Sequence, residues 1–79
     1  MERNEIIQTL TPVVHEVFQD DSLVLTDEMS ASTVDGWTSL TFMLLLKNIE
    51  DQFGFKFKML EILQLKTMGA IIKAIEVHT

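Results

Sequence analysis

The segment from Val34 to Leu40 places a hydroxyl group where an apolar helix should begin. If Thr38 is the N-cap, Ser39 falls in the first helical turn and its hydroxyl group faces solvent. The backbone N–H groups and the dipole at a helix start both stabilise negative charge, so a phosphodiester on Ser39 would be favourably placed. The alternative is that Ser39 is itself the N-cap, and the local pattern alone favours that reading, because serine is common before apolar helices.

Other reactive side chains give no support for an enzyme or a metal site. The chain has no cysteine, and its three glycines are too scattered to form a phosphate-binding loop. His15 is expected off the apolar face of the first helix, and His78 in a frayed C-terminal segment. Neither histidine has a second ligand at helical spacing, and no Ser–His–acid arrangement is indicated. We therefore expect no catalytic residue and no metal.

The net charge of −6 is unevenly distributed along the 79 residues. Residues 1–38 hold eight acidic side chains against one arginine, whereas residues 39–79 hold four against five lysines. A chain without a basic stripe is a poor nucleic-acid ligand, so no nucleic-acid partner is expected. The acidity suits basic partner surfaces or plain solubility, and charge alone does not separate these readings.

Hydropathy predicts a cytoplasmic protein without a membrane span. The longest unbroken apolar run, Phe42 to Leu46, is far shorter than the roughly 20 residues that a spanning helix needs. The first five residues are charged and polar and lack the apolar core of a signal peptide. One domain covering residues 1–79 is expected.

The elements that must position Ser39 follow from apolar periodicity. A first helix is predicted over residues 4–19, with Asn4 as N-cap and with a kink at Pro12 or a break after Thr11. A long connection over residues 20–38 must then be pinned to the core. Its candidate pins are Leu23, Leu25, Met29, Val34 and Trp37.

Three further helices are predicted after Thr38. The second runs over residues 39–53 and is stopped by Gly54, and a short turn covers residues 59–63. The last spans residues 67–77 with Thr67 as its cap, burying Met68, Ile71, Ile72 and Ile75. The expected fold is all-α: a four-helix bundle of three long helices and one short one, with the long loop between the first two.

Three motifs in order resemble the family of acyl and peptidyl carrier proteins. Residues 35–40, Asp-Gly-Trp-Thr-Ser-Leu, resemble the family's attachment motif, whose core is Asp-Ser-Leu, often preceded by Trp. Residues 49–55 resemble the end of the family's second helix, Leu-Glu-Glu-Glu-Phe-Gly-Ile. Residues 65–69 resemble Ile-Thr-Thr-Val-Gly, which opens its last helix. The resemblance covers almost the whole chain and implies the acyl-carrier bundle.

The resemblance implies that the chain is a monomeric carrier rather than an enzyme. A phosphopantetheinyl transferase would move 4′-phosphopantetheine from coenzyme A onto Ser39, using Mg²⁺, and the arm's thiol would hold acyl groups as thioesters. Acyl-loading and acyl-transfer enzymes would be the other partners. The residues that support the attachment motif would be Asp35, Gly36, Trp37, Thr38 and Leu40.

Three departures from the family pattern suggest unusual partners. Thr38 replaces the aspartate that usually precedes the serine, and in this family the transferase recognises that aspartate. The second helix replaces a typical glutamate with Leu44, and the short third helix is apolar instead of acidic. We expect a specialised fatty-acid, lipid or polyketide pathway, with an unmodified interaction module on the same fold as the alternative. The predicted partner-binding residues are Leu40, Met43, Leu44 and Lys47.

Overall fold

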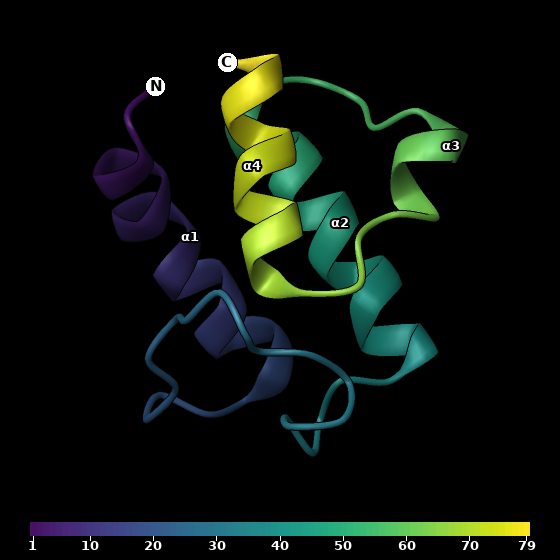
Figure 1. Ribbon diagram of the computed structural model, residues 1–79. Helices are drawn as coiled ribbons and strands as arrows, with labels where there is room; N and C mark the ends of the chain where they lie inside the picture. The colour runs from purple at the N-terminus through teal and green to yellow at the C-terminus, as the bar shows by residue number, and fades with distance from the viewer.

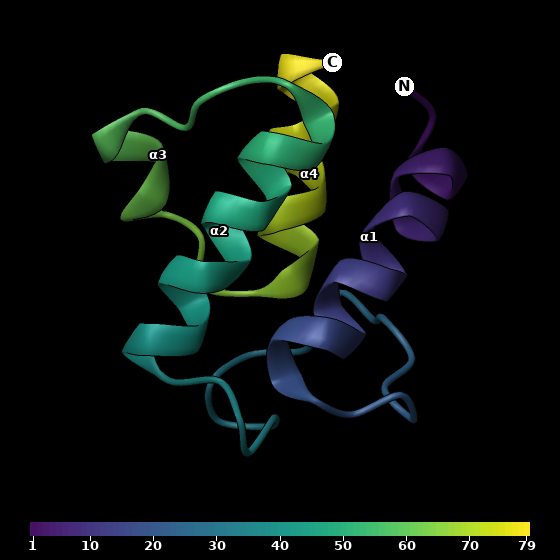
Figure 2. The same ribbon diagram turned by 180° about the vertical axis from the view of Figure 1, so that it is seen from behind.

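The computed structural model describes all 79 residues and contains four helices and no strands. Helix α1 spans Arg3–Phe18, α2 spans Ser39–Phe53, α3 spans Met59–Ile62 and α4 spans Met68–His78. α1 packs against both α2 and α4, whereas the short α3 lies on the side away from α1 in both views (Figures 1 and 2). The predicted all-α bundle is therefore confirmed. None of the four helices is both long and apolar enough to cross a membrane.

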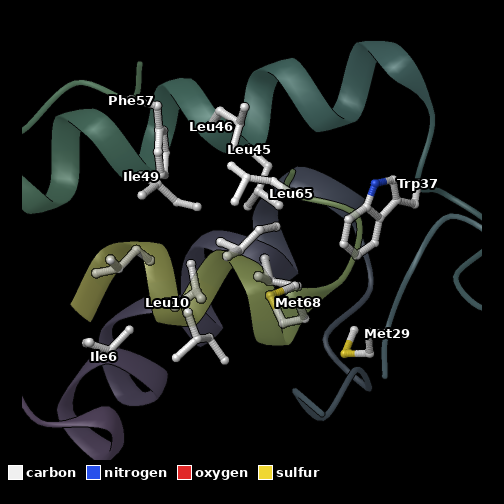
Figure 3. Close-up of a cluster of buried hydrophobic side chains, with 14 of the residues drawn as sticks. Ile6, Leu10, Met29, Trp37, Leu45, Leu46, Ile49, Phe57, Leu65 and Met68 are labelled. Atoms are coloured by element: carbon white, nitrogen blue, oxygen red, sulfur yellow. The ribbon is translucent and has the colours of Figure 1, made fainter. Parts of the chain in front are cut away.

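The core consists of 15 buried side chains, all of them apolar. Ile6, Leu10 and Val14 from α1 belong to one cluster with Leu45 and Ile49 from α2 and the predicted apolar stripe of α4. Figure 3 shows most of this cluster between the helices. The i, i+3, i+4 spacing on each long helix places these side chains on one face. The remaining core residues are Met29, Val34, Trp37, Leu46, Phe57, Leu65, Met68, Ile71, Ile72 and Ile75.

Helix α1 departs from the sequence prediction at two points. It begins at Arg3 with Glu2 as the N-cap, not Asn4, because the backbone N–H of Glu2 donates to Glu5 Oε1 at 3.3 Å. It also runs unbroken through Pro12, so the predicted break after Thr11 does not occur. Buried side chains lie on both sides of Pro12, and their packing holds the two halves of the helix against one core.

The long connection over residues 19–38 is pinned as predicted. Met29, Val34 and Trp37 are buried, and Leu23 and Leu25 pack half-buried against the core. The structure adds polar pins that periodicity did not indicate. The N–H of Met68 donates to Met29 O at 2.8 Å, and that of Gly69 to Asp27 O at 3.1 Å. Half-buried His15 donates from Nε2 to Leu23 O at 2.7 Å, which is a structural role.

The later helix boundaries fall close to their predicted positions. α2 has the predicted bounds and is followed by Gly54 as its C-cap, whose φ of 77° is the left-handed conformation that favours glycine. α3 is one residue shorter than predicted and buries no side chain completely. α4 begins at Met68, with Thr67 Oγ1 accepting from the N–H of Ala70 at 3.2 Å.

His78 does not lie in a frayed segment, which corrects the sequence prediction. It is the last residue of α4, is half-buried, and stacks on Phe55 with ring centroids 4.4 Å apart. Its Nε2 lies 2.8 Å from Glu61 Oε2, so it ties α4 to α3. The pKa of Glu61 is lowered mainly because the backbone N–H of Lys58 donates to its carboxylate, with a further contribution from His78.

Candidate functional site

A reciprocal pair of threonines caps the start of α2. Thr38 Oγ1 accepts from the N–H of Thr41 at 3.2 Å, and Thr41 Oγ1 accepts from the N–H of Thr38 at 2.8 Å. The Thr41 hydroxyl group also donates to Gly36 O at 2.6 Å, which ties the cap to the preceding turn. This arrangement satisfies two backbone groups that would otherwise lack partners at the helix start.

The capping pair leaves the Ser39 hydroxyl group free. Ser39 is the first residue of α2, is exposed, and its Oγ makes no hydrogen bond within the protein. Of the two readings that the sequence left open, the structure therefore selects Thr38 as the N-cap. The Ser39 hydroxyl group is available to another molecule, whereas those of Thr38 and Thr41 are occupied.

The electrostatic environment of Ser39 suits an anion. The backbone N–H groups of Ser39 and Leu40 have no acceptor in the protein, and no acidic side chain lies in the first turn of α2. Unpaired N–H groups and the positive end of the helix dipole stabilise a nearby phosphate by about 0.3–1 kcal/mol. The residues present therefore fit a phosphodiester on Ser39 Oγ.

Trp37 anchors the chain immediately before this site. Trp37 is 7 % exposed, and its indole ring stacks against two phenylalanine rings. The centroid distances are 5.8 Å to Phe18 at the end of α1 and 6.3 Å to Phe42 in α2. The backbone N–H of Trp37 donates to Val34 O at 3.1 Å. This stack joins the loop and two helices, and so fixes the position from which α2 starts.

Gly36 and Asp35 form the turn before Trp37. Gly36 does not need the left-handed conformation, since Gly54 is the only glycine with positive φ. A Cβ atom on Gly36 would lie 3.4 Å from Phe18 Cδ1, an ordinary contact distance. The turn therefore does not require glycine for its backbone geometry. Asp35 is exposed and makes no ion pair within the protein.

A pocket of about 460 Å³ opens beside Ser39. Trp37, Thr38, Ser39 and Phe42 form one side of it, and Ile62, Leu65 and Lys66 line the side contributed by α3 and the segment after it. Ala31 completes the lining. Ile62, Leu65 and Lys66 are not among the site residues predicted from the sequence. The signal for Leu65 and Lys66 was the resemblance of residues 65–69 to the start of the family's last helix, and Ile62 lies outside that motif.

The predicted apolar residues at the start of α2 are exposed beside Ser39. Leu40 is 70 % exposed, Met43 is 55 % exposed and Leu44 is 47 % exposed, while the Lys47 ammonium group pairs with Asp51 at 3.2 Å. The structure adds a second set on and just after α3 that the site prediction had left out. Its members, each more than half exposed, are Met59, Leu60 and Leu63. Phe42 of α2 and Ile62 of α3 both line the pocket at Ser39, and we call the six exposed side chains of the two sets together the apolar docking face.

Comparison with known proteins agrees with this geometry. The family model described as "Phosphopantetheine attachment site" matches residues 5–75. The solution NMR structure of a holo acyl carrier protein from Geobacter metallireducens superposes with a TM-score of 0.85 and 38 % sequence identity. That alignment covers 91 % of this chain and 83 % of the other. No curated protein sequence matches the chain.

The sequence resemblance, the bundle and the match over residues 5–75 all point to one assignment. The chain belongs to the acyl carrier protein family, whose prosthetic group is 4′-phosphopantetheine.

Proposed function

We propose that this protein carries acyl groups as thioesters on a 4′-phosphopantetheine arm attached to Ser39. The observation that carries the proposal is the exposed Ser39 hydroxyl group, which has no hydrogen-bond partner. Because the neighbouring hydroxyl groups of Thr38 and Thr41 are engaged in the cap, Ser39 is the nucleophile best placed for priming. The chain thus forms a carrier domain over residues 1–79 and leaves catalysis to its partners.

Priming converts the Ser39 hydroxyl group into a phosphodiester. Ser39 Oγ bonds to the phosphorus that bears pantetheine in coenzyme A, adenosine bisphosphate leaves with the electrons of the broken P–O bond, and the hydroxyl proton passes to a base of the transferase. The protein's contribution is to hold the product: the N–H groups of Ser39 and Leu40 have no acceptor in the protein and would stabilise the new negative charge. The arm's thiol supplies the group that forms thioesters. The tether then raises the effective concentration of cargo at each partner's active site.

The apolar docking face supports a specialised pathway over general fatty-acid synthesis. Exposed Leu44 and Leu60 are large apolar side chains on a protein whose acidic residues lie mostly in residues 1–38. Exposed apolar patches of this kind mark binding surfaces. We propose that Leu40, Met43, Leu44 and Lys47 contact partner enzymes whose docking surfaces are apolar rather than basic. We retain the predictions that the protein is cytoplasmic and monomeric.

Intact mass spectrometry tests the attachment. The protein is incubated with coenzyme A, Mg²⁺ and a phosphopantetheinyl transferase, and we expect a mass gain of one phosphopantetheine. Ser39→Ala should abolish that gain, while Ser32→Ala, which removes an exposed serine in the loop, should retain it. A primed Ser39→Ala variant would show that another residue is the attachment point.

A second assay tests the pathway. We expect weak acyl transfer between the primed protein and a general fatty-acid ketosynthase, because the docking face lacks carboxylates for a basic surface. Leu44→Glu should improve that transfer. Efficient transfer with the unchanged protein would contradict a specialised pathway but would leave the carrier function intact.

An unmodified interaction module is the second candidate, and Thr38 is the residue that favours it. Thr38 keeps the helix cap but lacks the charge of the aspartate that the transferase recognises in the family. A protein that several transferases fail to prime would fit this candidate. Its apolar docking face would then hold a partner without delivering cargo.

A further inference from the structure

The pocket beside Ser39 is lined largely by apolar side chains. Apolar side chains of Trp37, Phe42, Ile62 and Leu65 contribute to its lining. Its volume of about 460 Å³ lies within the range of sites that bind small molecules. Because Ser39 itself is part of the lining, a group tethered to Ser39 starts at the edge of this pocket.

Lys66 is the single charged side chain in the lining of this pocket. Its ammonium group is exposed and makes no ion pair, whereas Lys47 pairs with Asp51 and Lys56 approaches Glu50. The backbone of Lys66 is held, since its N–H donates to Gln64 O at 2.9 Å. No carboxylate lines the pocket to neutralise this charge.

The start of α2 adds positive potential on the other side of the pocket. Thr38 and Ser39 line it, and the N–H groups of Ser39 and Leu40 are without acceptors. A partly apolar pocket between a helix start and an unpaired ammonium group favours a ligand with an apolar stem and an anionic end. An exposed lysine attracts such an anion most strongly at low ionic strength.

We propose that Lys66 binds an anionic oxygen of the group tethered to Ser39. The anion is either the phosphodiester of the arm or a carboxylate on a short acyl cargo. If it is the carboxylate, the pocket selects half-thioesters of dicarboxylic acids over neutral acyl groups. This inference rests on the proposed attachment at Ser39. Lys66 acts as a binding and specificity residue and takes no part in bond making.

Three primed forms of the whole protein distinguish the two sources of the anion. A phosphopantetheinyl transferase loads coenzyme A, butyryl-coenzyme A or malonyl-coenzyme A, and intact mass verifies each product. Butyryl and malonyl groups are similar in size, but only malonyl ends in a carboxylate. Trp37 is the only tryptophan in the chain and lines the pocket, so its fluorescence reports occupancy. The ³¹P NMR shift reports the phosphodiester.

The matched variants are Lys66→Gln and Lys73→Gln. Lys73 is an exposed lysine of α4 that makes no ion pair and does not line this pocket. If the carboxylate is bound, Trp37 emission should differ between the malonyl and butyryl forms. That difference should disappear in Lys66→Gln, persist in Lys73→Gln, and vanish when the salt concentration rises from about 0.01 M to about 1 M.

If the phosphodiester is bound, a different pattern is expected. Lys66→Gln should shift the ³¹P resonance equally in all three forms, and Lys73→Gln should leave it unchanged. The inference is overturned if primed Lys66→Gln has the same Trp37 emission and the same ³¹P shift as the parent protein in all three forms. That result would leave the proposed attachment at Ser39 unaffected. If the parent protein shows no mass gain after incubation with the transferase, both the attachment at Ser39 and the role of Lys66 are overturned.

Discussion

Replacement of Trp37 by alanine tests how the fold holds the proposed attachment site at Ser39. Trp37 is 7 % exposed and its indole ring stacks against both Phe18 and Phe42, so it bridges the end of α1 and the first turns of α2. Trp37→Ala removes the ring from both stacks and leaves a void next to the pocket at Ser39. The loop before Ser39 then loses its largest buried anchor.

The free energy of unfolding that Trp37→Ala should lose is a large part of the free energy of unfolding of the whole domain. Truncation of a buried tryptophan costs about 3–5 kcal/mol, and each aromatic pair contributes about 0.5–1.5 kcal/mol to that figure. The free energy of unfolding of a domain of this size is about 4–12 kcal/mol at 0.05–0.15 kcal/mol per residue. Each kcal/mol corresponds to about 4–8 °C in Tm, so Trp37→Ala should lower Tm by at least about 12 °C.

Thermal unfolding followed by far-ultraviolet circular dichroism measures this change. Trp37→Phe, which keeps one aromatic ring in the stack, should lose less than half as much stability. Val24→Ala is a control, because Val24 is exposed in the same loop and should leave Tm unchanged. A fall of less than about 4 °C for Trp37→Ala would refute the idea that the stack anchors the loop.

Further substitutions test the turn, the cap and an ion pair. Gly54→Ala should cost about 1 kcal/mol of unfolding free energy in urea titrations because of its positive φ, whereas Gly36→Ala should change it by less than about 0.5 kcal/mol. Thr38→Ala should cost about 1 kcal/mol in the same assay by removing the N-cap of α2. The pKa of Glu61 in the folded protein lies below its ordinary value of 4.5. Ionised Glu61 therefore stabilises the folded protein above pH 4.5, and this stabilisation is lost as the pH falls through the lower pKa of the folded state. Below pH 4.5 the urea midpoint of Glu61→Gln should therefore fall less steeply with decreasing pH than that of the parent protein. The same dependence on pH in both proteins would contradict this prediction.

Apolar periodicity and turn chemistry predicted most of the fold. The stripe of α4 and the stop at Gly54 follow local rules, and the structure has them where the rules place them. The loop pins Met29 and Trp37 were also predictable, because large apolar side chains in a polar stretch must find burial.

Features that depend on contacts distant in sequence were not predictable. The sequence predicts a kink at Pro12 or a break after Thr11, and the break does not occur because packing of both halves on one core outweighs the lost hydrogen bond. His78 was assigned to a frayed segment because its partners, Phe55 and Glu61, come from elements that periodicity does not bring together. Lys66 reaches the pocket at Ser39 only through the path of the chain after α3.

The local geometry of the candidate site was predicted in part. The sequence indicated a hydroxyl group at the start of α2, but it favoured Ser39 as the cap on local grounds. Thr41, three residues after Thr38, was the overlooked signal, since a hydroxyl group at that position completes a reciprocal cap. The exposure of Leu44 depends on how α2 rotates against the core, which a single sequence does not determine.

Tandem mass spectrometry of the primed protein tests the central claim most directly. Digestion and fragmentation locate the added phosphopantetheine among the three hydroxyl groups at the start of α2. The free oxygen of Ser39 should bear all of it, and Thr38 and Thr41, which are held in the cap, should bear none. An arm on either threonine, or on a residue outside α2, would contradict the account.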